Sequence, residues 1–190
     1  MTKVVYFHGF GSSSKTQKVS FLVEHFPDCT IVAPNIPPQA DAAYAVIEAL
    51  MWHLLEDNEP IILAGTSLGG FWAHLFGDRF ACKSVIMNPA LTPSESLKSF
   101  VDQPVPFEGY TAEGFTNEDA DEYKKYQDQL TFKYYENCFR TVLLEEGDEL
   151  LDSRVSYDKY ADNSIATLIP GGEHRFASLG QFQEQLRSLL

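Results

Sequence analysis

One serine of this sequence lies in a pattern that typically produces a nucleophile. Gly65-Thr66-Ser67-Leu68-Gly69 fits the Gly-x-Ser-x-Gly pattern of a nucleophile elbow, and Gly70 follows directly. In such an elbow a strand turns sharply into a helix, so bulky side chains two residues before and after the serine would clash. The pattern arises by chance in roughly one chain of this composition in twenty, so its surroundings decide its value.

The surroundings of Ser67 agree with such an elbow. Residues 60–64 are wholly apolar, as expected of a strand covered by helices on both faces, and residues 71–80 have the apolar spacing of a helix. The serine hydroxyl would then stand at the positive end of the helix. We therefore predict that Ser67 is the nucleophile of an acyl-transfer reaction.

A serine nucleophile needs a general base, and His174 is the best placed of the five histidines. It follows the strand predicted at residues 166–169, and Gly171 and Gly172 give its loop the freedom to reach back over the sheet. The histidines that fall within predicted helices, and for which we expect no catalytic role, are His25, His53 and His74.

The acid of a triad should follow an earlier strand. Asp148 comes directly after Gly147 and the strand predicted at residues 141–144, whereas Asp152 is expected to begin the next helix. Glu145 and Glu146 are expected to lie still on the strand. The order Ser67, Asp148, His174 is that of α/β-hydrolase triads, and differs from the orders in chymotrypsin and subtilisin.

The loop His8-Gly9-Phe10-Gly11-Ser12 follows the strand predicted at residues 3–7. It can direct the backbone N–H of Phe10, together with that of Leu68, at a developing oxyanion, an arrangement worth several kcal/mol in the transition state. The alternative is a plain glycine turn. We expect His8 to make a supporting hydrogen bond, and we expect Phe10, Gly11 and Phe176 to contact the substrate.

The pattern of the whole chain is strand and helix in alternation, which predicts an α/β fold in one domain, residues 1–190. We expect a compact, mostly parallel sheet of about six strands with helices on both faces. The predicted strands are residues 3–7, 29–33, 60–64, 84–87, 141–144 and 166–169. The predicted helices are residues 16–25, 40–55, 71–80 and 179–189.

A segment of about residues 93–137 breaks this alternation. It contains no clear strand and is rich in acidic residues from Glu108 to Glu122, after which Tyr123, Tyr126, Leu130 and Tyr134 recur at helical spacing. Two interpretations remain open: a small lid or cap insertion at the carboxyl edge of the sheet, or a helix packed on the body with a solvated acidic face.

Composition excludes several classes of partner. The formal net charge of −13 argues against nucleic acid and weakly against polyanionic substrates. No apolar run approaches the ~20 residues of a membrane span, and the N-terminal residues have the pattern of a strand, so we expect a cytoplasmic protein. Cys29, Cys82 and Cys138 lack metal-ligand spacing and are expected to be reduced thiols, with no metal or other cofactor.

Several of these motifs together resemble the YqiA-like bacterial esterases, compact members of the α/β-hydrolase superfamily. The matching segments are residues 6–13, 65–70, 88–90, 147–152 and 171–176. The resemblance is weakest between about residues 101 and 137. It implies a triad of Ser67, Asp148 and His174, hydrolysis of small carboxylic esters with acyl thioesters as a further option, and no metal.

Two rival functions remain from the sequence. The first keeps the fold but cleaves a thioester or a peptide bond, and the second is a binding module that is catalytically idle. For a hydrolase, we expect activity to rise with pH as His174 becomes neutral, near the ordinary imidazole pKa of about 6.5. The oligomeric state stays undetermined.

Overall fold

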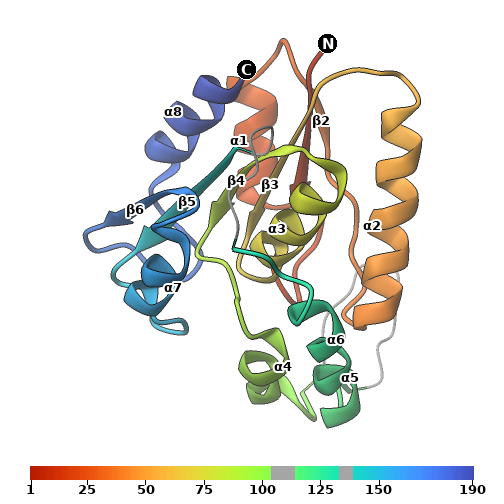
Figure 1. The fold of residues 1–190 in the computed structure, drawn as a ribbon, viewed down its shortest axis with the longest axis vertical. Helices are drawn as coiled ribbons and strands as arrows, with labels where there is room; N and C mark the ends of the chain where they lie inside the picture. The colour runs from red at the N-terminus through yellow and green to blue at the C-terminus, as the bar shows by residue number, and fades with distance from the viewer. Residues whose placement is uncertain (104–113, 133–138) are drawn as a thin grey trace.

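The computed structural model describes residues 1–103, 114–132 and 139–190, and its centre is a six-stranded sheet (Figure 1). The strand order is β2-β1-β3-β4-β5-β6, and each neighbouring pair is parallel. The strands are β1 (Lys3–Phe7), β2 (Thr30–Val32), β3 (Ile61–Thr66), β4 (Lys83–Met87), β5 (Arg140–Glu145) and β6 (Ile165–Ile169). The predicted α/β fold class and all six predicted strands are therefore confirmed.

Helices connect the strands. They are α1 (Gln17–His25), α2 (Ala40–Leu55), α3 (Leu68–Phe80), α4 (Pro93–Ser96), the 3₁₀ helix η1 (Leu97–Phe100), α5 (Asn117–Glu122), α6 (Lys124–Gln127), α7 (Ser153–Tyr160) and α8 (Leu179–Leu189). All four predicted helices are present, although α3 begins three residues earlier than predicted. Asp152 caps α7, as expected, by accepting hydrogen bonds from the backbone N–H groups of Arg154 and Val155. No helix in the described ranges is long and apolar enough to span a membrane.

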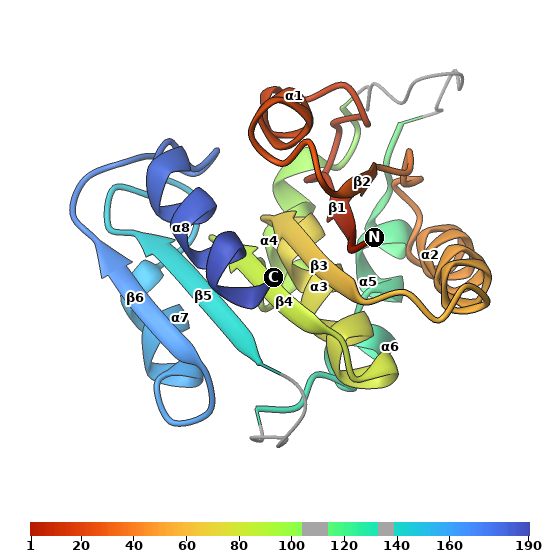
Figure 2. The ribbon, with the colours of Figure 1, turned by 90° about the horizontal axis from the view of Figure 1, so that it is seen from above.

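Helices cover both faces of the sheet, with α1 and α8 on one side and α2, α3 and α7 on the other (Figure 2). Alternating side chains of the strands form two cores, one on each face. On one face Val5, Leu63 and Val142 pack with residues of α2, α3 and α7. On the other face Val4 and Ile62 pack with residues of α1 and α8. Helices on both faces bury every residue of β1, β3 and β5, whereas the edge strands β2 and β6 are partly exposed.

The order of the strands reverses between β1 and β3. The chain passes from β1 outward to β2, and then returns through α2 to place β3 on the other side of β1. The loops that leave β1 and β3 therefore diverge at the carboxyl edge of the sheet, where parallel α/β folds bind their ligands. His8 and Ser67 directly follow these two strands.

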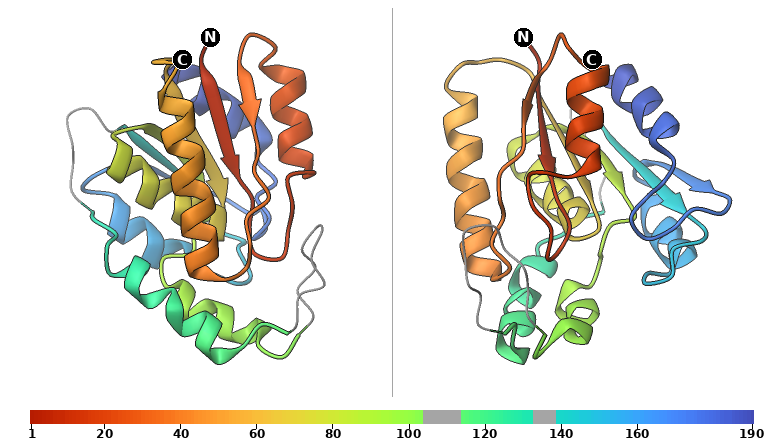
Figure 3. Two further views of the ribbon diagram at one scale, coloured as in Figure 1. Left: turned by 90° about the vertical axis from the view of Figure 1, so that its right-hand side faces the viewer. Right: turned by 180° about the vertical axis from the view of Figure 1, so that it is seen from behind.

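The helices between β4 and β5 lie beyond the carboxyl ends of the strands (Figure 3). Tyr123 is fully buried and its hydroxyl donates to the carbonyl of Pro38 at 2.8 Å, while the Tyr126 hydroxyl donates to Asp41 at 3.0 Å. Glu118 and Glu122 are exposed. Residues 114–132 are thus packed on the body with acidic side chains in solvent. Action as a lid stays a prediction, and Glu108, Tyr134 and Cys138 lie outside the described residues.

Candidate active site

Ser67 occupies a sharp turn between β3 and α3. Its backbone has φ 57° and ψ −122°, a conformation that costs a non-glycine residue on the order of 1–3 kcal/mol. Glycine is required on both sides: a Cβ on Gly65 would lie 2.2 Å from the Gly69 carbonyl oxygen, and one on Gly69 would lie 1.9 Å from the Phe7 carbonyl oxygen. The predicted strand–turn–helix context of Ser67 is therefore present.

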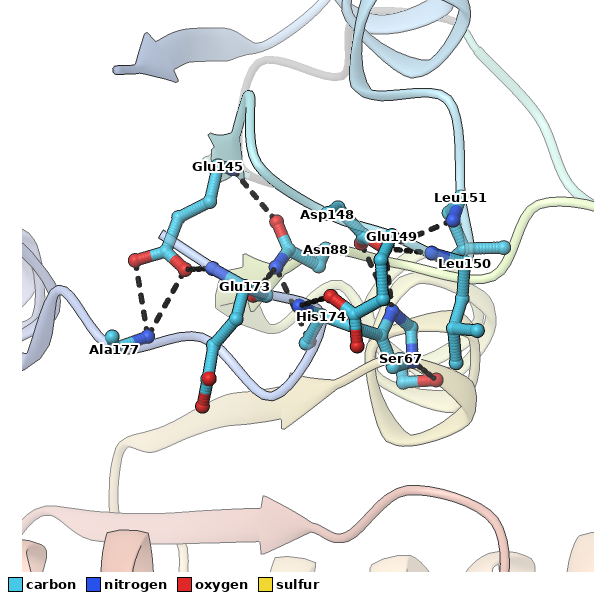
Figure 4. A network of polar contacts seen from close by, with 10 residues as sticks. All are labelled: Ser67, Asn88, Glu145, Asp148, Glu149, Leu150, Leu151, Glu173, His174 and Ala177. Atoms are coloured by element: carbon cyan, nitrogen blue, oxygen red, sulfur yellow. Dashed lines mark hydrogen bonds and ion pairs between the residues drawn. The ribbon is translucent and has the colours of Figure 1, made fainter. Parts of the chain in front are cut away.

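His174 lies between Ser67 and Asp148, and hydrogen bonds join all three side chains (Figure 4). Its Nε2 is 2.9 Å from Ser67 Oγ, and its Nδ1 is 2.9 Å from both carboxylate oxygens of Asp148. Because an ionised carboxylate only accepts, Nδ1 carries the proton and donates it to Asp148. The lone pair of Nε2 then faces the serine hydroxyl, as a general base requires.

The Asp148 carboxylate is held by its own loop. Its Oδ1 accepts hydrogen bonds from the backbone N–H groups of Leu150 and Leu151, each at 2.9 Å. The loop is joined to that of His174, because Gly147 N–H donates to the carbonyl of Gly171 at 2.7 Å. The Asp148 side chain is only 2% exposed, so its orientation toward His174 is fixed before any substrate binds.

The loop after β1 lies against Ser67. A Cβ on Gly9 would be 3.5 Å from Ser67 Cβ. His8 is buried and uses both ring nitrogens for support: Nε2 accepts from the N–H of Ile36 at 3.0 Å, and Nδ1 donates to the carbonyl of Gly9 at 2.8 Å. Burial lowers the pKa of His8, which keeps it neutral. These contacts agree with the supporting role expected for His8.

The two predicted oxyanion donors are placed by different means. Leu68 is the first residue of α3, so its N–H has no acceptor within the helix. Phe10 is held by its ring, which packs on Phe100 and Phe115 with centroids 5.1 and 4.7 Å away. These aromatic contacts fix the position of Phe10. Donation of its backbone N–H to an oxyanion remains a proposal.

A groove of about 1550 Å³ opens above Ser67 and His174. Its walls are the loop after β1, η1, residues 149–151 and the loop that carries His174. Gly11 and Phe176 also line it, but Phe176 is only 2% exposed and so offers little surface to a ligand. The charged lining is mixed, with basic residues such as Lys18 and Arg175 beside acidic Glu149 and Glu173.

Two polar residues near His174 were not identified as functional from the sequence. Asn88 directly follows β4, and Glu145 is the last residue of β5. Both contact the backbone of the His174 loop. Two signals were available: Asn88 lies in a segment that carries the family resemblance, residues 88–90, and both residues are polar and lie at the carboxyl end of a parallel strand.

A parallel sheet of this order, with a serine turn after β3 and a histidine loop after the last strand, defines the α/β-hydrolase fold. Comparison with solved structures agrees with this fold. The chain superimposes on Est1E from Butyrivibrio proteoclasticus with bound ferulic acid at a TM-score of 0.74 and 14% identity, covering 99% of this chain and 87% of that one. The chain also superimposes on one of the metagenome-derived lipolytic enzymes LipS and LipT, at a TM-score of 0.71 and 18% identity. That match covers 98% of this chain and 92% of the other.

The chain belongs to UPF0227, described as an uncharacterised protein family, whose model matches residues 3–190. A UPF0227 protein of Klebsiella pneumoniae is 30% identical over 159 residues, which is 82% of this chain and 80% of the relative. The family match confirms the resemblance to the YqiA-like group, and the solved structures show that the fold is that of α/β hydrolases.

Proposed function

We propose that this protein is a serine hydrolase that cleaves carboxylic esters through an acyl-enzyme intermediate. The observation that carries the proposal is the continuous hydrogen-bond chain from Ser67 through His174 to Asp148, each link 2.9 Å long, at the floor of an open groove. Nucleophile, base and orienting acid are thus already in contact, as the chemistry requires.

In the first half of the reaction, Ser67 Oγ attacks the ester carbonyl carbon while His174 Nε2 takes the hydroxyl proton. The carbonyl oxygen becomes an oxyanion, which accepts hydrogen bonds from the N–H groups of Phe10 and Leu68. When the tetrahedral intermediate collapses, the bond to the alcohol oxygen breaks, and the alcohol leaves with the proton from His174. Asp148 stabilises the imidazolium while it exists.

In the second half, water replaces the alcohol. His174 removes a proton from the water as its oxygen attacks the acyl carbon, and the Ser67 ester bond then breaks. The carboxylic acid is released and Ser67 regains its proton from His174. The reaction needs no metal ion or cofactor.

The groove supports a small-molecule ester as the substrate, with Phe10 and Gly11 as substrate contacts and the segment after β4 as one wall. Phe176, which was also expected to contact the substrate, is too deeply buried to be a main contact. The names of structural neighbours, which include esterases and lipolytic enzymes, favour the same class. A cytoplasmic location is part of the proposal and is compatible with the free thiol of Cys29.

A fluorophosphonate probe tests the proposal. We expect it to label the wild-type protein at Ser67, to leave Ser67→Ala unlabelled, and to label His174→Ala far more slowly, as read by mass spectrometry of the modified peptide. Rates on aryl esters, acyl-CoA and peptides then identify the bond that is cleaved. Absence of labelling in folded wild-type protein would reject a nucleophilic serine and favour the binding module.

A further inference from the structure

Glu145 is a completely buried carboxylate that contacts the loop carrying His174. Its two oxygens accept hydrogen bonds from the backbone N–H groups of Glu173 at 2.7 Å, Ala177 at 3.0 Å and Ser178 at 2.7 Å. The first two contacts are visible in Figure 4. The side chain of a strand residue therefore binds the loop on both sides of His174.

Asn88 binds the same loop from β4. Its Nδ2 donates to the carbonyls of Glu173 at 3.0 Å and His174 at 3.2 Å, while its Oδ1 accepts the backbone N–H of Glu145 at 2.8 Å. The backbone of Asn88 has φ 41°, a region that asparagine tolerates better than most residues. Asn88 and Glu145 thus bind carbonyls and N–H groups of one peptide segment.

The loop needs such external partners because its irregular backbone does not pair the N–H groups of Glu173, Ala177 and Ser178. Gly171, Gly172 and Phe176 all have positive φ, at 72°, 79° and 65°, so the segment forms neither helix nor strand. Buried N–H groups there would otherwise lose their hydrogen bonds. The loop also leads into α8, whose N-cap, Ser178, makes no side-chain cap of its own. A carboxylate at that helix terminus is electrostatically favourable.

The fit of Glu145 is close and its charge is stabilised. A Cβ on Gly172 would lie 2.2 Å from the Glu145 carboxylate, so only glycine allows the loop to pass there. Burial alone would raise the pKa of Glu145, but the hydrogen bonds from Ser178, Glu173 and Ala177 outweigh it and lower the pKa. The group therefore acts as a charged acceptor.

We propose that Glu145 and Asn88 form a positioning pair that holds His174 Nε2 at hydrogen-bonding distance from Ser67 Oγ. The catalytic meaning of that distance rests on the proposed function, whereas the ordering of the loop does not. The hydrogen bonds of the imidazole go to Asp148 and Ser67, whereas Glu145 and Asn88 bind backbone groups of the loop, so both act through the backbone. A displacement of about 1 Å is enough to slow a positioned reaction on the order of 100-fold.

The test compares Glu145→Gln with Glu146→Gln. Glu146 is the next residue, and its carboxylate pairs with Arg154 at 2.6 Å instead of the His174 loop, so the two variants lose the same charge in nearly the same place. Three quantities are measured in each folded variant: amide hydrogen exchange at residues 173–178, the low-field proton resonance of His174 Nδ1–H, and the rate of fluorophosphonate labelling.

We expect Glu145→Gln to exchange these amides at least about 10-fold faster, to lose or shift the low-field resonance, and to be labelled about 10- to 100-fold more slowly. Glu146→Gln should match the wild type in all three. Unchanged exchange and an unchanged resonance in folded Glu145→Gln would overturn the proposal. If exchange and resonance respond in a protein that no probe labels, the positioning pair stands and the proposed hydrolase function fails.

Asn88→Asp provides a second variant if Glu145→Gln does not fold. It keeps the shape of the side chain and its acceptor for Glu145 N–H, but loses both donors to the loop carbonyls. We expect the same direction of change in exchange and resonance. A folded Asn88→Asp protein with wild-type values for both would also overturn the proposal.

Discussion

Two histidines of this protein have similar partners in different surroundings. His174 lies between the Ser67 hydroxyl and the Asp148 carboxylate. His74, in α3, accepts from the Tyr160 hydroxyl at 2.9 Å through Nδ1 and donates to the Thr131 carbonyl at 2.8 Å through Nε2. A carboxylate is near the second histidine as well, with Asp78 3.4 Å from Nε2.

The two histidines differ in the backbone that carries them and in their access to solvent. His74 is fully buried on a regular helix, and burial raises the pKa of Tyr160 far above its ordinary value, so the phenol stays protonated. His174 is on an irregular loop at a groove, and its side chain is 14% exposed. A histidine between a hydroxyl and a hydrogen-bond acceptor is thus structural in one place and suited to catalysis in another. Residue types alone do not distinguish them.

Replacing each histidine by alanine should separate the two roles most strongly. We expect His174→Ala to lower kcat/KM for an aryl ester at least about 10⁴-fold with little loss of stability. His74→Ala should instead cost about 2–4 kcal/mol of unfolding free energy, because it leaves Tyr160 unpaired and a void in the core. Esterase assays and urea unfolding of both variants measure this. Equal activity losses per folded molecule would break the comparison.

The aspartates beside the two histidines, Asp148 and Asp78, extend the comparison. Asp148→Asn should lower kcat about 10³- to 10⁴-fold, because the amide favours the wrong tautomer of His174. Asp78 pairs with the buried guanidinium of Arg140, so Asp78→Asn should cost about 3 kcal/mol of stability and leave kcat nearly unchanged. The kinetic constants and the unfolding midpoints of the two variants are the measurement. A large kcat loss in Asp78→Asn would connect the buried network to the site.

Glycines near the two ends of α3 test the difference between the constrained backbone of the serine turn and the regular helix around His74. A Cβ on Gly69 would meet the Phe7 carbonyl oxygen at 1.9 Å, whereas one on Gly77, near His74, has its closest neighbour at 3.5 Å. We expect Gly69→Ala to destabilise by about 3–5 kcal/mol and Gly77→Ala to be neutral or stabilising by up to ~1 kcal/mol. Thermal unfolding of the two proteins decides this. Tolerance of alanine at Gly69 would contradict the close contact of the serine turn with β1.

His74 should also make stability depend on pH, which is the smallest of the effects expected here. Burial lowers its pKa below the ordinary value of about 6.5, so below that pH the unfolded chain binds a proton that the folded protein does not. Stability from this group is therefore present above pH ~6.5 and is lost as the pH falls, at up to about 1.4 kcal/mol per pH unit. Urea unfolding between pH 5 and 7 should show a shallower slope for His74→Gln. An identical slope would mean that His74 binds protons equally in the folded and unfolded chain, so that burial does not lower its pKa.

The elements of the fold were predictable because their signals are local. Apolar runs bounded by glycine and proline identified all six strands, and the glycines flanking Ser67 identified the turn. The start of α3 was placed late because Gly69 and Gly70 are poor helix formers, whereas packing against β1 and Pro89 requires glycine in that turn. The segment after β4 allowed two interpretations, since helical spacing does not say which surface a helix covers.

By itself, the sequence determined the parallel sheet, the serine turn and the order of Ser67, Asp148 and His174, because periodicity and turn chemistry depend on neighbouring residues. Only the tertiary structure decided that the supporting hydrogen bond of His8 joins it to the N–H of Ile36, and that Asn88 and Glu145 bind the loop of His174. Those contacts join residues from 28 to 86 positions apart. No local pattern encodes them, since a buried carboxylate finds its N–H partners only when the strands have brought separate loops to one edge of the sheet.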